Sequence, residues 1–127
     1  MANEVSNDYL GGDIPEITSE TAATPKQLYR NTDDKYFKLT KLVLTNQSTT
    51  TTQIVRLVDA DLSDSGEDTY KGESYRKLSI AIGPQTTITL NEDDFGPIYF
   101  RYGVAGYNST SVSSGSGVLV RVVGEEL

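Results

Sequence analysis

The sequence predicts an all-β protein: an antiparallel β-sandwich of the jelly-roll or immunoglobulin-like kind that carries an extended N-terminal arm. From Tyr36 onward, short runs of alternating apolar and polar residues are separated by polar turns, the pattern of strands with one face on a core. The chain of 127 residues is long enough for one domain with one core. Its hydrophobic fraction of 36% is low for a globular protein, which indicates a segment outside the core.

Residues 1–34 are predicted to form the arm, and residues 35–127 the sandwich domain. Gly11, Pro15 and Pro25 interrupt any regular element there, and the apolar residues have no clear period. We expect the arm to lie across a partner subunit through its large apolar side chains, because a purely solvating linker would lack them. These are Tyr9, Leu10, Ile14, Ile17, Leu28 and Tyr29. A disordered arm is the alternative, given the acidic and polar composition.

The first strand of the domain is predicted from Tyr36 to Asn46, with a change of phase at its centre. Phe37 and Leu39 alternate in one phase and Leu42 and Leu44 in the other, which predicts a β-bulge around Thr40-Lys41. The polar stretch 46–52 is predicted to turn the chain into a hairpin with residues 53–60.

Four further strands are predicted, over residues 75–82, 86–90, 97–107 and 118–124. An acidic turn covers 91–97, and a Ser/Gly-rich loop follows 107. Gly103, Gly106, Gly115 and Gly117 are read as turn glycines. The core rows are predicted to face one another: Ile98, Phe100, Val118, Val120 and Val122 against Leu78, Ile80, Ile82 and Ile88. Because Leu119 and Val123 add apolar residues to the second face of the last strand, we expect a subunit interface to cover it, with Leu119, Val123 and Tyr99 as oligomer contacts.

Residues 59–73 are predicted to form an acidic loop. Asp59 and Asp61 fit the first ligand positions of an EF-hand, but Asp64 stands where the turn requires Gly and Tyr70 where a bidentate Glu is required. A solvated acidic loop is therefore expected. A looser calcium site formed by Asp59, Asp61 and Asp64 is the alternative.

The composition argues against an enzyme. The chain has no His and no Cys, which removes Ser-His-Asp and Cys-His catalysis and the usual zinc sites. The remaining constellation is a carboxylate pair drawn from Glu92, Asp93, Asp94 and the 59–73 loop, and acids in turns are ordinarily solvated. We therefore expect no catalytic residue and no cofactor.

Charge and hydropathy restrict the partners as well. The formal charge of −7 disfavours direct binding to nucleic acid. The sequence lacks an apolar run near 18 residues and a signal-peptide pattern, so we expect no membrane partner and synthesis in a cytoplasm.

Three runs carry a family resemblance: residues 42–48, which end in Thr-Asn-Gln-Ser, residues 80–90, and residues 115–124. In style they resemble the small β-sandwich head decoration, or cement, proteins of tailed phages. The resemblance implies a homotrimer on the outer surface of a virion, assembled in the host cytoplasm. It also implies arms that reach over the major capsid protein or neighbouring subunits and reinforce the shell.

Two other functions remain open. One is a carbohydrate- or receptor-binding module of a virion fibre or tail, in which Tyr99, Tyr102 and Tyr107 stack on sugar rings and the acidic loops hold calcium. The other is a tail or neck component that shares the structural class and differs only in its partner. The tyrosines also suit half-buried strand positions without any ligand.

Overall fold

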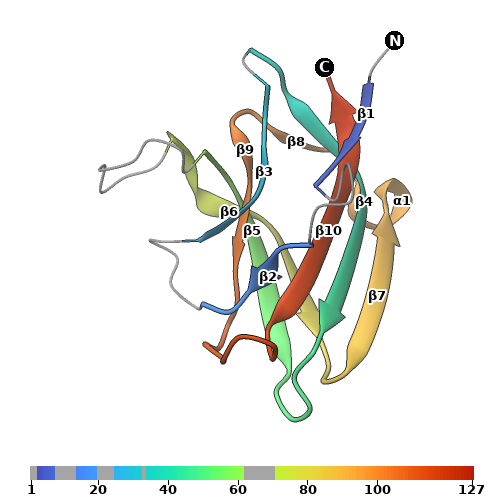
Figure 1. Ribbon diagram of the computed structural model, residues 1–127. Helices are drawn as coiled ribbons and strands as arrows, with labels where there is room; N and C mark the ends of the chain where they lie inside the picture. The colour runs from blue at the N-terminus through green and yellow to red at the C-terminus, as the bar shows by residue number, and fades with distance from the viewer. Residues whose placement is uncertain (1–2, 8–13, 20–24, 33, 62–70) are drawn as a thin grey trace.

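The computed structural model describes residues 3–7, 14–19, 25–32, 34–61 and 71–127, and it consists mostly of strands in two antiparallel sheets (Figure 1). This confirms the predicted all-β class. Sheet A contains β1 (Asn3–Ser6), β2 (Glu16–Ile17), β4 (Phe37–Asn46), β7 (Thr86–Asn91), β8 (Ile98–Phe100) and β10 (Val118–Glu126). Sheet B contains β3 (Lys26–Arg30), β5 (Gln53–Asp61), β6 (Lys71–Ile82) and β9 (Gly103–Tyr107). The one-turn helix α1 (Glu92–Phe95) follows β7.

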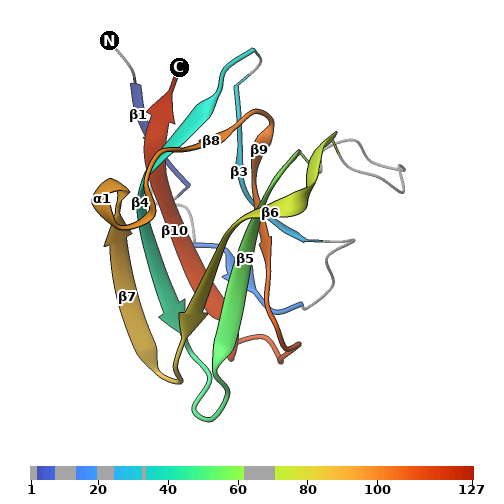
Figure 2. The same cartoon turned by 180° about the vertical axis from the view of Figure 1, so that it is seen from behind.

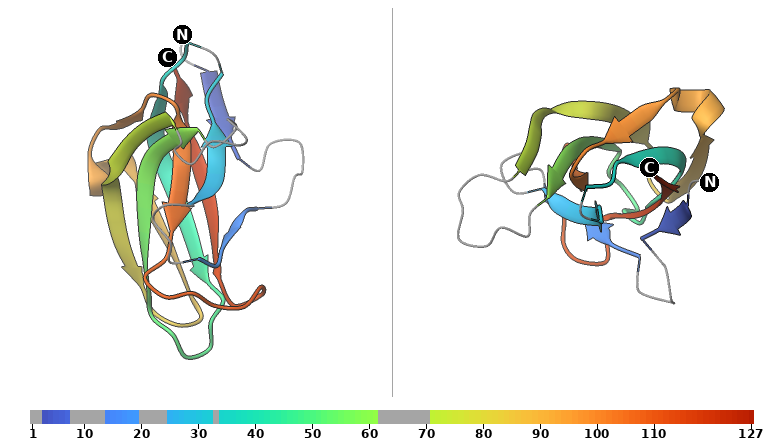
Figure 3. Two further views of the ribbon diagram at one scale, coloured as in Figure 1. Left: turned by 90° about the vertical axis from the view of Figure 1, so that its left-hand side faces the viewer. Right: turned by 90° about the horizontal axis from the view of Figure 1, so that it is seen from above.

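The two sheets form two layers with the core between them (Figures 2 and 3). Sheet A has the order β1-β10-β4-β7, with β2 also beside β10 and β8 also beside β4; sheet B has the order β3-β9-β5-β6. The predicted rows meet in one apolar cluster: Phe100, Val118, Val120, Val122 and Ile82 are buried in it, and Leu78, Ile80, Ile88 and Ile98 pack against it.

The predicted bulge in β4 is confirmed. Leu39 pairs with Gly124 and Lys41 with Val123, which leaves Thr40 as the extra residue. Its hydroxyl lies 3.1 Å from the carbonyl oxygen of Val123 and donates to it. The extra residue changes the side-chain phase, so that both halves of β4 direct their leucines into the core.

The predicted hairpin between residues 36–46 and 53–60 is wrong, because β4 and β5 belong to different sheets. Asn46, fully buried, redirects the chain: its Nδ2 donates to the carbonyl oxygens of Thr51 at 2.8 Å and of Ile82 at 3.1 Å. The hydroxyl of Ser48 accepts from the N–H of Thr51 at 2.9 Å. These hydrogen bonds satisfy backbone groups of the turn that connects the two sheets. The chain therefore passes from sheet A to sheet B instead of folding back on β4.

Residues 97–107, predicted as one strand, form two strands in different sheets: β8 in sheet A and β9 in sheet B. β9 pairs with β3 and β5 in sheet B, whereas β10 pairs with β1, β2 and β4 in sheet A. Gly103 and Gly106 are strand residues and not turn glycines. A Cβ on Gly103 would lie 2.6 Å from the carbonyl oxygen of Tyr29 and 2.7 Å from that of Ala60, so β3 and β5 can approach β9 only because this side chain is absent.

The described parts of residues 1–34 supply three strands, β1, β2 and β3, to the two sheets, which corrects the prediction of a separate arm. β1 and β2 pair with β10, and β3 pairs with β9. Ile17 is fully buried, Leu28 is buried, and the ring centroid of Tyr29 lies 4.7 Å from that of Phe37. These three side chains were expected to bind a partner; they fill their own core. Ile14 is exposed, whereas Tyr9 and Leu10 lie outside the described residues.

Glu16 fastens β2 to the turn before β10. Its Oε2 accepts hydrogen bonds from the N–H of Gly115 at 2.8 Å, the N–H of Gly117 at 2.9 Å and Nε2 of Gln47 at 2.9 Å. Burial acts to raise the pKa of Glu16, but the hydrogen bonds outweigh it, led by those from Gly117 and Gly115, and the pKa is lowered. The folded state therefore favours the carboxylate form.

Replacing Glu16 with glutamine weakens these hydrogen bonds and is expected to lower the free energy of unfolding near neutral pH. The loss should be only about 1 kcal/mol, because solvent partly screens the site. A lowered folded-state pKa means that this stabilisation is present above the ordinary Glu pKa and is lost as pH falls through the folded value. The gap between wild type and E16Q should thus narrow in acid, as measured by urea unfolding across pH. Glu4→Gln, at an exposed position, should change stability by less than about 0.5 kcal/mol at neutral pH. Equal behaviour of E16Q and E4Q would contradict the role of Glu16.

Candidate interaction surface

Exposed hydrophobic side chains gather on the outer face of sheet A, at the end that carries the C-terminus. Tyr36 is 41% exposed, Tyr99 45% and Leu127 48%. Tyr36 and Leu127 extend the β4–β10 ladder through two backbone hydrogen bonds of 3.1 and 2.9 Å. Tyr99 pairs with Lys38, two residues beyond Tyr36 and on the same outward row, because the intervening Phe37 points into the core. We call this surface, with Arg101 and Tyr102, the tyrosine–arginine surface.

Arg101 is held between two tyrosines. Its Nη1 donates to the hydroxyl of Tyr36 at 2.8 Å, and its guanidinium carbon lies 5.2 Å from the ring centroid of Tyr36 and 5.4 Å from that of Tyr102. Hydrogen bonds to Tyr102 and Tyr36 raise the pKa of Arg101. The guanidinium is therefore a fixed cation with aromatic neighbours.

Asp59 fixes the backbone beneath this arginine. Its carboxylate is almost fully buried; Oδ2 accepts from the N–H of Arg101 at 2.8 Å, and Oδ1 accepts from those of Tyr102 at 2.8 Å and Gly103 at 3.4 Å. Asp61 pairs with Arg30 at 3.1 Å. Of the calcium candidates, Asp59 thus bonds the 101–103 turn, Asp61 bonds Arg30, and Asp64 lies outside the described residues. In the part of the chain that the structure describes, no three acidic side chains gather in a metal-binding group.

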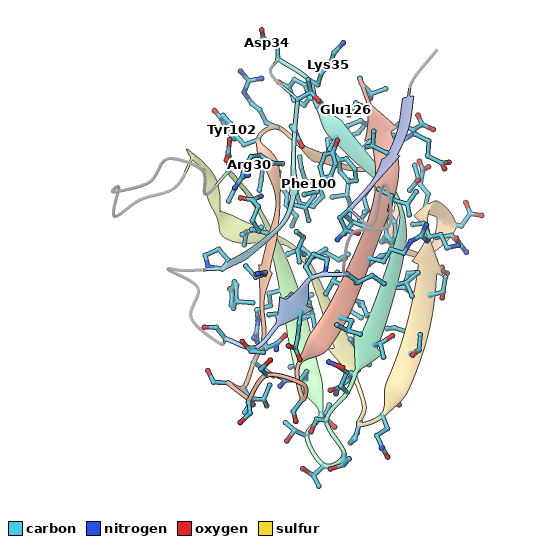
Figure 4. The ribbon with its side chains drawn as sticks, viewed as in Figure 1. Arg30, Asp34, Lys35, Phe100, Tyr102 and Glu126 are labelled. Carbon is cyan, nitrogen blue, oxygen red and sulfur yellow. The ribbon has the colours of Figure 1, made fainter. Side chains whose placement is uncertain are left out.

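A polar pocket of about 320 Å³ adjoins the tyrosine–arginine surface and shares Arg101 and Tyr102 with it. Its other lining residues are Asn31, Thr32, Asp34, Lys35 and Asp61. Figure 4 shows Asp34, Lys35, Tyr102 and Arg30 at this end of the molecule. Nδ2 of Asn31 donates to the carbonyl oxygens of Phe100 at 2.9 Å and Lys35 at 3.2 Å, which fixes the 31–36 loop. The pocket offers hydrogen bonds and charges of both signs.

The structure does not gather the three tyrosines expected to bind sugars. Tyr102 lines the pocket, and Tyr99 lies on β8 in sheet A. Tyr107 is at the far end of β9, roughly 16 Å along the strand from Tyr102, with the guanidinium carbon of Arg56 6.0 Å from its ring centroid. Tyr36 and Leu127 were not singled out from the sequence, because their neighbourhood depends on the pairing of β4 with β10.

The predicted oligomer contacts differ in accessibility. Val123 is only 7% exposed in the single chain, so its own chain already covers it. Leu119 is half-buried, and Tyr99 is exposed.

The acids considered for catalysis lie on different elements. Glu92 of α1 pairs with Lys38 at 3.1 Å, and Oδ2 of Asp94 accepts from the N–H of Asn91 at 2.8 Å. Asp93 is exposed on the same helix. Asp59 and Asp61 end β5 in the other sheet. Each of these carboxylates except Asp93 thus has a structural partner of its own.

Comparison of the chain with protein-family models, curated proteins and solved structures found no match. None of the helices among the described residues has the length and apolar character needed to span a membrane.

Proposed function

We propose that this chain is a non-catalytic structural protein that decorates and stabilises a virion shell. It docks on the major capsid protein or another virion subunit through the tyrosine–arginine surface, and not through a free arm. The observation that carries the proposal is the gathering of exposed Tyr36, Tyr99 and Leu127 around the fixed Arg101. Tyr and Arg are the side chains enriched at the centres of protein interfaces. The virion assignment is supported by the resemblance of residues 42–48, 80–90 and 115–124.

Rigidity supports docking at this surface. Asp59 holds the 101–103 backbone, and Tyr36 and Tyr102 hold the guanidinium, so little conformational entropy is lost when a partner binds.

We further propose a jelly-roll type for the two-sheet fold. In the sequence, the paired strands β5 and β6 lie between the paired strands β4 and β7. The later strands β9 and β10 then pair with the free sides of β5 and β4, so the nested pairs alternate between the two sheets. The trimer implied by the resemblance stays a prediction.

The test uses shells assembled from the major capsid protein encoded by the same genome. Tyr36→Ser combined with Tyr99→Ser should weaken co-sedimentation with shells at least about tenfold, because it removes two central interface side chains. Ile54→Ser is the matched control, since Ile54 is exposed on sheet B away from this surface, and it should bind like wild type. Circular dichroism checks that each variant is folded. Equal binding by the double variant, or no binding by wild type, would contradict the proposal.

The polar pocket favours a second candidate, a carbohydrate- or receptor-binding module of a fibre or tail. Asn31, Lys35, Arg101 and Tyr102 supply hydrogen-bond donors and one aromatic ring at its lining. Glycan binding by wild type that is lost in Tyr102→Ala, without any shell binding, would select this candidate instead. Loss of that binding in EDTA would add calcium to it.

A further inference from the structure

β7 forms an open edge of sheet A. It pairs with β4 on one side, and neither Figure 1 nor the reverse view in Figure 2 shows a strand beyond it. Within the described residues, the neighbouring β6 belongs to the other sheet. The peptide groups on the outer side of β7 are therefore available to another strand.

The ladder identifies which groups these are. In a central antiparallel strand, successive residues direct their N–H and C=O to opposite neighbours. The N–H of Gln47, at the end of β4, donates to Gly117 on the β10 side, so Asn46, Leu44 and Leu42 face β7. Their partners Thr86, Ile88 and Leu90 are thus bonded to β4, and Thr87, Thr89 and Asn91 face outward.

The far end of this edge agrees with the assignment. The N–H of Asn91 donates to Oδ2 of Asp94 at 2.8 Å, so it does not bond β4. Thr87 and Thr89 are left as the two residues that present their N–H and C=O at the open edge, since no hydrogen bond joins these groups to another described residue. Both side chains are exposed.

β7 also lacks the features that normally protect an edge. Its sequence, Thr-Thr-Ile-Thr-Leu-Asn, contains no charge and no proline, and its pairing with β4 has no register shift. The described edge strands of sheet B differ: β3 begins and ends with Lys26 and Arg30, and β6 carries several charged residues and has shifts in its pairing with β5. Charges and bulges of this kind hinder edge-to-edge pairing.

We propose that β7 pairs with β7 of a second copy of this chain, antiparallel and centred on a two-fold axis at Ile88. This register places Thr87 opposite Thr89 of the second copy and Thr89 opposite its Thr87. Each pair can exchange two backbone hydrogen bonds. The two open threonines are two residues apart, so a two-fold axis at Ile88 places each of them opposite the other one in the second copy. No third chain is needed to complete the hydrogen bonds. The flanking pair Thr86–Leu90 brings no like charges together, and threonine pairs are favourable across strands.

The dimer should be weak. One pair of six-residue strands buries less than the roughly 1,200–2,000 Å² of a stable interface, so we expect dissociation in the micromolar range or weaker. The proposal is independent of the proposed function. A trimer, as the resemblance implies, would have to use another surface.

The experiment compares two double variants of the full chain by sedimentation over a concentration series. Wild type should form a species of twice the 13.9 kDa chain mass. Thr87→Lys with Thr89→Lys places like charges opposite each other in both pairs, and its dissociation constant should rise at least about tenfold. Thr87→Lys with Thr89→Glu places opposite charges in the same pairs, and it should dimerise at least as well as wild type. Both variants lose the 3.0 Å hydroxyl contact between Thr45 and Thr87, so that loss cancels in the comparison.

Thr89→Pro is a second variant that blocks the edge differently. It removes the outward N–H of residue 89 while keeping the bonds of β7 to β4, so it should be monomeric and folded. A wild type that is monomeric at all concentrations would overturn the proposal. So would a dimer that persists equally in the double-lysine variant.

Discussion

Replacing Ile17 with alanine is expected to lower the free energy of unfolding by about 2–5 kcal/mol, the range for truncating a fully buried aliphatic side chain. Ile17 is completely buried in the core cluster, and its Cδ1 would lie 2.9 Å from a Cβ on Gly106. Its carbonyl oxygen accepts from Nδ2 of Asn108 at 2.7 Å, which keeps β2 in place while the side chain is removed. The cavity therefore has little means of collapsing.

Urea unfolding of the full chain measures this effect, and Ile14→Ala is the matched control. Ile14 lies three residues earlier in the same segment but is exposed, so its truncation should cost less than about 0.5 kcal/mol. Equal, small losses for both variants would show that residues 14–19 do not belong to the core. That result would restore the arm interpretation.

Replacing Asp59 with alanine is expected to cost about 3 kcal/mol. The buried carboxylate accepts three backbone N–H groups, two of them at 2.8 Å, and hydrogen bonds to a charged acceptor contribute more than neutral ones. Alanine leaves these donors unsatisfied at the start of β9. Asp59→Asn keeps one accepting oxygen and should lie between alanine and wild type.

Thermal and urea unfolding test this prediction with Asp61→Ala as control. Asp61 forms a surface ion pair with Arg30, whose side chain is 51% exposed, so its loss should cost at most about 1 kcal/mol. The amide resonances of Arg101 and Tyr102 should shift in D59A and stay unchanged in D61A. Similar stabilities for the two variants would contradict the role of Asp59.

Local pattern was enough to predict much of the strand content. Alternation placed strands over 36–46, 53–60, 75–82 and 86–90, close to β4, β5, β6 and β7. The phase change at Thr40-Lys41 predicted the bulge, because one extra residue inverts every later side chain. Pairing was not predictable in the same way. A hairpin of β4 with β5 was the simplest prediction, and the hydrogen bond from Asn46 to Ile82, 36 residues later, opposes it.

For the candidate surface, too, local pattern predicted some residues, and long-range pairing decided the others. Tyr99 and Tyr102 were predicted as sugar-stacking residues, and Tyr99 also as an oligomer contact; Arg101 lies between them in the sequence. Tyr36 and Leu127 join them because the first residue before β4 meets the last residue of the chain. Asp59 looked like a solvated loop acid, since its three partners are more than 40 residues away.

By itself, the sequence determined the all-β class, the strands near 36–46, 53–60, 75–82, 86–90 and 118–124, and the lack of His and Cys chemistry, because these depend on composition and on the two-residue period of a strand. It did not reveal that 97–107 divides into two strands of different sheets. Tertiary structure alone decided where the described residues among 1–34 belong. Their short, irregular apolar pattern has no period of its own, and it becomes regular only when β10 and β9 supply a ladder and the core supplies space for Ile17 and Leu28. The free energy that orders this segment comes from long-range contacts.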